Sequence, residues 1–77
     1  MASTEPGEER FAATAATLRR QLAALAFEVA RVEDDLAATL DRLAKRDPDR
    51  ADELHERAEA ARRYAEFERE TARRYDD

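Results

Sequence analysis

Apolar residues recur at alternating steps of three and four along the middle of the chain, which is the spacing of one face of an α-helix. The pattern is interrupted only at Thr39 and extends backwards to Ala15 and Phe11. It therefore predicts one long amphipathic helix with an apolar seam of about five heptads. The central members of the seam are Leu18, Leu22, Leu25, Val29, Val32, Leu36 and Leu43.

The end of this helix is predicted by a change of charge followed by proline. Lys45 and Arg46 would occupy a last helical turn, and Asp47-Pro48 follows at once. Asp47 suits an N-cap and Pro48 the first position of a second helix. We expect an all-α antiparallel hairpin, with helices over about 8–46 and 48–75 and a turn at 46–48. Residues 1–8 are expected to be a disordered lead-in to the helical hairpin of residues 9–77.

A second pattern leaves an alternative open. Alanine recurs at every seventh residue, and its phase is unbroken through the expected turn. One continuous helix kinked at Pro48 would explain this, but a proline inside a helix costs about 3 kcal/mol, which favours the hairpin. The alanine column comprises Ala16, Ala23, Ala30, Ala37, Ala44, Ala51, Ala58, Ala65 and Ala72.

In a hairpin turning at Asp47, residues whose numbers sum to about 94 lie at the same height. The large residues of the first helix then fall opposite alanines of the second. The expected packing is therefore large against small. The predicted levels are Leu36 with Ala58, Val29 with Ala65, Leu22 with Ala72, Leu40 with Leu54, and Phe27 with Phe67.

The apolar surface is wider than one hairpin can cover. Besides the leucine-rich seam, the first helix carries the alanine column and Phe27, and its N-terminal part overhangs the shorter second helix. A second copy could cover this surface and complete a four-helix bundle, so we expect a homodimer, or else another helical protein as partner. The expected interface residues are Phe11, Leu18, Leu22, Leu25, Phe27, Val29, Val32, Leu36, Tyr64 and Phe67.

Composition narrows the classes of partner. The chain has 77 residues, no cysteine and a net charge of -5 with the signs interleaved, so no disulfide or thiolate metal site can form and nucleic acid is not an expected partner. The sequence also has no long uncharged apolar run and no pattern of a signal peptide. We therefore expect a cytoplasmic protein without membrane insertion.

Residues suited to catalysis are sparse. No Ser-His-Asp set, nucleophilic cysteine or glycine-rich phosphate loop can be assembled, so we expect no enzyme and no cofactor. Asp52 and His55 form Asp-x-x-His on one helix face, a spacing similar to the Glu-x-x-His of di-iron bundles, but nothing opposite them suits a metal. The leading functional hypothesis is a non-enzymatic interaction module that serves as an adaptor, assembly or regulatory subunit.

Two resemblances suggest alternatives. The tip, with Asp47, Pro48, Asp49 and Asp52, resembles the acidic coiled-coil tips that DksA-like transcription factors insert into the secondary channel of RNA polymerase, although this chain lacks their zinc-binding cysteines. The resemblance implies a regulator that binds a larger machine. Tyr64-x-x-x-Glu68 resembles the motif of small helical type VII secretion substrates, whose Trp-x-Gly turn is absent here.

Overall fold

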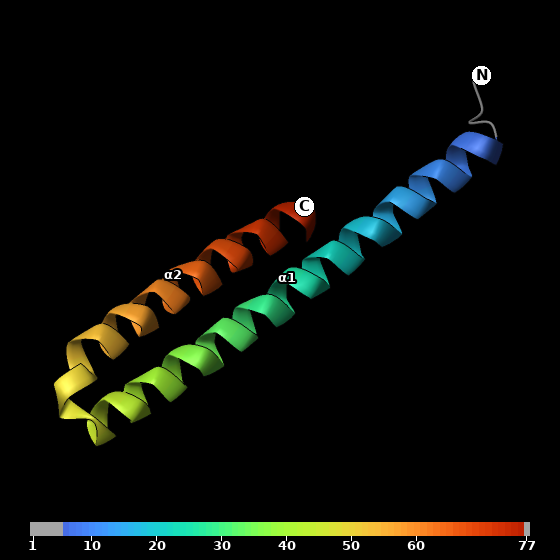
Figure 1. Cartoon of the computed structure of the whole chain (residues 1–77). Coiled ribbons are helices and arrows are strands. Elements are labelled where there is room, and N and C mark those ends of the chain that lie inside the picture. The colour runs from blue at the N-terminus through green and yellow to red at the C-terminus, as the bar shows by residue number, and fades with distance from the viewer. Residues whose placement is uncertain (1–5, 77) are drawn as a thin grey trace.

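The chain forms an antiparallel pair of helices. The computed structural model describes residues 6–76 and contains α1 (Pro6–Arg46), a short 3-10 turn η1 (Pro48–Arg50) and α2 (Ala51–Asp76). Figure 1 shows the two helices side by side and joined by the tight turn. The molecule is 71 Å long and only 13 × 11 Å in cross-section. The all-α hairpin is confirmed, and the continuous kinked helix is not formed.

The N-terminal boundary of α1 differs from the expected one. Pro6, Gly7 and Glu8 are helical, so the helix begins two residues before the predicted start and takes up part of the expected lead-in. Proline is well suited to the first turn because its missing N–H would have no partner there. Glu8 and Glu9 then place negative charge beside the positive end of the helix dipole. Residues 1–5 of the lead-in lie outside the described part of the chain.

Asp47 alone separates α1 from η1. Its backbone N–H donates to the Leu43 carbonyl at 3.0 Å, and its carbonyl accepts from the Arg50 N–H at 3.0 Å. The predicted N-cap position is correct, but the Asp47 side chain makes no capping hydrogen bond. Pro48 follows as the first residue of the new helical segment. Both backbone groups of the single linking residue are therefore satisfied across the turn.

The core of the hairpin consists almost entirely of alanine. The buried apolar residues are Ala23, Ala26, Ala30, Ala37 and Ala44 on α1, and Leu54, Ala58, Ala61, Ala65 and Ala72 on α2. Alanine columns on both helices let the two backbones approach closely along their whole overlap. The alanine-rich seam, rather than the leucine-rich one, therefore holds the two helices together.

The predicted large-against-small packing is wrong. Ala37 clusters with Ala58, and Ala23 with Ala72, so facing residues sum to 95 rather than about 94. A helix rotates by about 100° per residue, and this one-residue difference exchanges Leu36 for Ala37 at the contact. The height of each pair was predicted almost correctly, whereas the face of α1 that meets α2 was not.

The two helices differ in length, as expected. Because Ala72 lies beside Ala23, α2 ends near the level of Arg19. The N-terminal part of α1 extends beyond it, as the blue end of the ribbon in Figure 1 shows. Phe11, in this overhang, is 77% exposed. We refer to residues 6–18 as the overhang.

Candidate interaction surface

Large aliphatic side chains form an exposed line along α1. We call this line the leucine stripe, and its members range from 36% exposed at Val29 to 65% at Val32. The stripe is exposed because the alanine column occupies the side of α1 that faces α2. It comprises Leu18, Leu22, Leu25, Val29, Val32, Leu36 and Leu43.

The apolar surface continues from α1 onto one side of α2. Leu36 and Leu40 of α1 line a shallow groove together with Ala60, Ala61 and Tyr64 of α2. Glu33 and Arg57 also line this groove. Tyr64 and Phe67 border a neighbouring apolar hollow and are themselves largely exposed. One edge of the hairpin therefore presents aliphatic and aromatic side chains from both helices, and we call it the apolar edge.

The other edge carries ion pairs between the helices. Arg69 Nη1 lies 2.7 Å from Asp34 Oδ2, and Asp41 contacts both Arg62 and His55, with its Oδ1 3.0 Å from His55 Nδ1. Asp34 and Asp41 are seven residues apart, as are Arg62 and Arg69, so the pairing repeats with the alanine column. We call this edge the charged edge.

Adjacent residues explain why the two edges differ. Leu40 and Asp41 lie three and four residues after Ala37. On a helix, the residue three positions later lies to one side of the starting residue, and the residue four positions later lies to the other side. Ala61 and Arg62 stand in the same relation to Ala58. Leu40 packs against the Ala37, Ala58 and Ala61 cluster on one side, and Asp41 meets Arg62 on the other.

The ion pairs of the charged edge shift the pKa values of Asp41, Arg62 and Arg69. Hydrogen bonds from Arg62 and then from His55 hold the pKa of the Asp41 carboxyl below its ordinary value. The hydrogen bond to the carboxylate of Asp34 raises the pKa of Arg69, because it favours the charged form of the guanidinium. These groups are at the surface, so each ion pair contributes little to the free energy of folding. The pairs do specify which edges of the two helices lie together.

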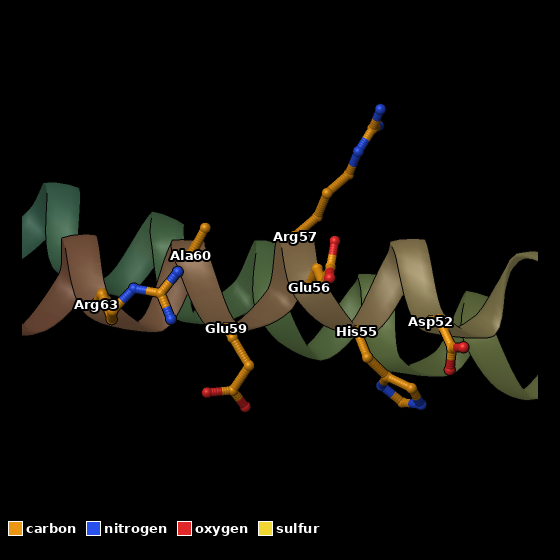
Figure 2. Close-up of a pocket in the computed structure, with 7 residues that line it drawn as sticks. All are labelled: Asp52, His55, Glu56, Arg57, Glu59, Ala60 and Arg63. Atoms are coloured by element: carbon orange, nitrogen blue, oxygen red, sulfur yellow. The ribbon is translucent and has the colours of Figure 1, made fainter.

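His55 is paired with a residue of the other helix. Asp41 on α1, rather than Asp52, supplies the carboxylate within hydrogen-bond distance. Figure 2 shows Asp52, His55 and Glu59 pointing to one side of α2 while Arg57 points away from them. No group of three possible metal ligands forms within residues 6–76.

The expected interface residues are all exposed in the hairpin, but they do not all share one face. Phe27 lies seven residues before Asp34 and fourteen before Asp41, which places it on the charged edge. Phe67 lies at a similar height, in the hollow that it shares with Tyr64 on the outer side of α2. The level predicted for the two phenylalanines is close to that observed, but they do not lie on the same face of the hairpin.

The acidic tip is formed at the closed end of the hairpin. Asp49 and Asp52 are exposed, Asp47 is half-buried, and none of the three takes part in an ion pair within the described segment. The Tyr64 to Glu68 motif lies inside α2.

The alanine core and the ion pairs of the charged edge carried signals that sequence reasoning did not use. Alanine at every seventh residue was expected either to mark a continuous helix or to form part of the surface for a second copy, and not to form the hairpin core. The matching spacing of Asp34 with Asp41 and of Arg62 with Arg69 was also present. Together these repeats could have identified the face of α1 that meets α2.

Comparison with known proteins yields no further guide. No family model, curated protein or solved structure matches the chain. Over the part of the chain that the structure describes, neither helix contains a stretch long and apolar enough to cross a membrane.

Proposed function

We propose that this chain is a non-enzymatic helical interaction module that acts as a homodimer, in the role of an adaptor, assembly or regulatory subunit. The observation that carries the proposal is the exposure of the leucine stripe in a hairpin whose own core is alanine. Apart from Leu40 and Leu54, the large aliphatic side chains are not used to hold the two helices together. They are arranged in one continuous line that a further helix can cover.

The free energy available at this surface supports association. Burying one leucine or phenylalanine side chain completely contributes roughly 1.5 to 3 kcal/mol, and the stripe offers several side chains that are about half exposed. Apolar burial on this scale exceeds the contribution of surface ion pairs, which is small. The alanine core supplies little by comparison, because each alanine buries only one methyl group. Association therefore adds a substantial part of the stability of the folded protein.

A second copy is the simplest partner for such a stripe. Two-fold symmetric pairs are the commonest closed assemblies, and they require a surface that complements itself. The overhang also leaves apolar side chains without a neighbouring helix, and a second hairpin can supply one. The four helices of two copies then share a larger apolar core.

Light scattering coupled to gel filtration tests the proposal. The wild-type chain of 8.8 kDa is expected to elute with twice that mass at micromolar concentration. Val32→Glu, in the stripe, should yield the monomer mass because it places a charge in the contact. Ala24→Glu is the matched control, since Ala24 is exposed outside the stripe, and it should retain the dimer. A wild-type monomer at every concentration, melting cooperatively, would contradict the proposal.

The acidic tip supports a second candidate, a regulator that inserts the closed end of the hairpin into a larger machine such as RNA polymerase. The supporting observation is the exposure of Asp49 and Asp52 at the end of a narrow helical pair. Replacing Asp47, Asp49 and Asp52 by lysine should abolish binding to the polymerase while helicity and mass stay unchanged. Equal binding by the variant and the wild type would exclude this candidate.

A further inference from the structure

We propose that the partner on the leucine stripe is a second copy whose α1 runs antiparallel to the first, with residues whose numbers add up to 54 facing each other. This inference rests on the proposed homodimer and specifies its geometry. The two-fold axis then passes near residue 27, at the middle of the stretch from Phe11 to Leu43. Each contact occurs twice, once on each side of the axis.

This register matches apolar residues over the whole stripe. In antiparallel pairs of helices the two kinds of seam position face each other, so each residue of one α1 meets a residue of the other kind in its partner. The single polar seam residue, Thr39, falls opposite a small alanine. The facing pairs are Phe11 with Leu43, Ala15 with Thr39, Leu18 with Leu36, Leu22 with Val32, and Leu25 with Val29.

The charges beside the stripe favour the same register. Arg19 of one copy lies beside Glu33 of the other, and neither takes part in an ion pair of its own hairpin within residues 6–76. Arg19 is exposed and Glu33 half-buried, so both can reach a partner. The like-charge contact of this register is between Glu28 and its own copy near the axis. Two attractive pairs therefore flank one repulsive pair.

Other arrangements fit less well. A slide of seven residues one way leaves Thr39 and Leu43 without an apolar residue opposite them, and the opposite slide leaves Phe11 and Ala15 without one. The second slide also places Glu28 beside Asp35 of the other copy. A parallel pair places Glu28 beside Glu33, twice in each dimer, because residues five apart meet across parallel helices. The antiparallel register alone combines full apolar overlap with an attractive pair.

The overhang is also accounted for by this register. Residues 6–18 of one α1 fall beside residues 36–48 of the other, which are the last turns of that helix and the start of the hairpin turn. Phe11, which has no α2 beside it in its own hairpin, meets Leu43 of the second copy. The difference in length between α1 and α2 thus leaves room for the second copy to extend along the first.

A charge-exchange experiment tests the register. Arg19→Glu and Glu33→Arg should each weaken the homodimer about tenfold, since each variant replaces two attractive pairs by two repulsive ones. In a mixture of the two variants, however, both pairs of the heterodimer are again attractive. With one variant labelled with nitrogen-15, native mass spectrometry should show roughly nine-tenths heterodimer instead of the statistical half. The doubly substituted chain, carrying both changes, should recover the wild-type affinity.

The matched control exchanges charges away from the stripe. Arg31→Glu and Glu56→Arg are both exposed and outside every ion pair of the described hairpin, and their mixture should give the statistical half. A statistical mixture of Arg19→Glu with Glu33→Arg, from a wild type that is dimeric, would overturn the register and leave the homodimer standing. A monomeric wild type would remove both proposals.

Disulfide cross-linking gives an independent reading of the register. Because the chain has no cysteine of its own, Leu18→Cys and Leu36→Cys each introduce a single thiol. On mild oxidation the mixture should form mainly the mixed dimer, since these two positions face each other in the antiparallel register. Self-linked Leu18→Cys would indicate a parallel pair and would overturn the inference.

Discussion

Ala37 of α1 packs against Ala58 of α2 at the centre of the hairpin, while Leu36, the residue before Ala37, is left 46% exposed. Ala37 is 1% exposed and Ala58 is fully covered. The hairpin therefore builds its own core mainly from alanine, with Leu54 and the half-buried Leu40. The leucine stripe remains available for another molecule, and this division underlies the predictions that follow.

The buried alanines between α1 and α2 should not tolerate replacement by a larger side chain. Ala37→Leu is expected to lower the free energy of unfolding by about 1 to 3 kcal/mol, because the added atoms must separate the two backbones. Ala38→Leu is the matched control, since the neighbouring residue is exposed and has room for the change. Urea denaturation followed by circular dichroism measures both variants. Equal losses in the two variants would contradict an alanine core.

The charged edge should make the hairpin sensitive to acid. Since Arg62 and His55 hold the pKa of Asp41 below its ordinary value in the folded state, this contribution to stability is present above about pH 4 and is lost as the pH falls through the folded value. Asp41→Asn should be less stable at neutral pH and should show a shallower acid dependence.

Thermal melts between pH 2 and pH 7 test this prediction. Glu53 is the appropriate comparison, because its pKa is also lowered, but by Arg50 of the same helical end rather than by the other helix. Glu53→Gln should leave the part of the acid dependence that comes from Asp41 in place. If the melting temperature of Asp41→Asn fell with decreasing pH as steeply as that of the wild type, Asp41 would not be a source of the acid sensitivity.

Glu28 should oppose dimerisation in the proposed register. Near the two-fold axis its carboxylate faces its own copy, and removing one like-charge contact at the surface strengthens an association by a few-fold. Glu28→Gln is therefore expected to lower the dimer dissociation constant, measured by sedimentation at low salt. In 1 M salt the difference from the wild type should disappear because surface charges are screened. A weaker Glu28→Gln dimer would contradict the contact.

Phe11 should contribute to the affinity of the dimer and very little to the stability of the single hairpin. It is 77% exposed, so Phe11→Ala should change the unfolding of a monomeric background such as Val32→Glu by less than about 0.5 kcal/mol. In the wild-type background the same change should weaken dimerisation about tenfold or more, since the ring is buried against Leu43 only in the pair. Phe11→Leu should restore most of the affinity. An unchanged dissociation constant would show that the overhang is not covered.

Pro48 should stabilise the turn by restricting the unfolded chain. It is the first residue of the 3-10 turn, where its fixed backbone angle is suitable and its missing N–H costs nothing. Pro48→Ala is expected to lower the free energy of unfolding by roughly 0.4 to 1 kcal/mol. Asp49→Ala, the next residue, is the control and should have a smaller effect. Thermal unfolding of the two variants compares them directly.

The positions of the helices could be predicted from the sequence because their ends are determined locally. The basic last turn of α1 and the Asp47-Pro48 step are short-range signals, and the observed end at Arg46 agrees with them. The heights of facing residues follow from the turn and the rise per residue. These predictions needed no knowledge of how the side chains pack.

The face of α1 that meets α2 could not be predicted with the same reasoning. The leucine stripe is the strongest apolar signal, so the sequence predicts it both at the contact with α2 and at the interface with a second copy. The structure assigns that contact to the alanines, where close approach of the backbones also brings Asp34 to Arg69 and Asp41 to Arg62. Which face of α1 contacts α2 depends on the side chains of both helices at once. The periodicity of apolar residues along one helix does not contain that information.

The unbroken spacing of alanine through the turn has a consequence for exchange between molecules. Ala44 and Ala51 are seven residues apart, so a chain straightened at Asp47 carries a single alanine face along its whole length. Two straightened chains lying antiparallel can form the same alanine contacts between molecules that one hairpin forms within itself, which is the condition for domain swapping. Straightening would place Pro48 inside a continuous helix at a cost of about 3 kcal/mol, and this cost favours the hairpin over the exchanged pair.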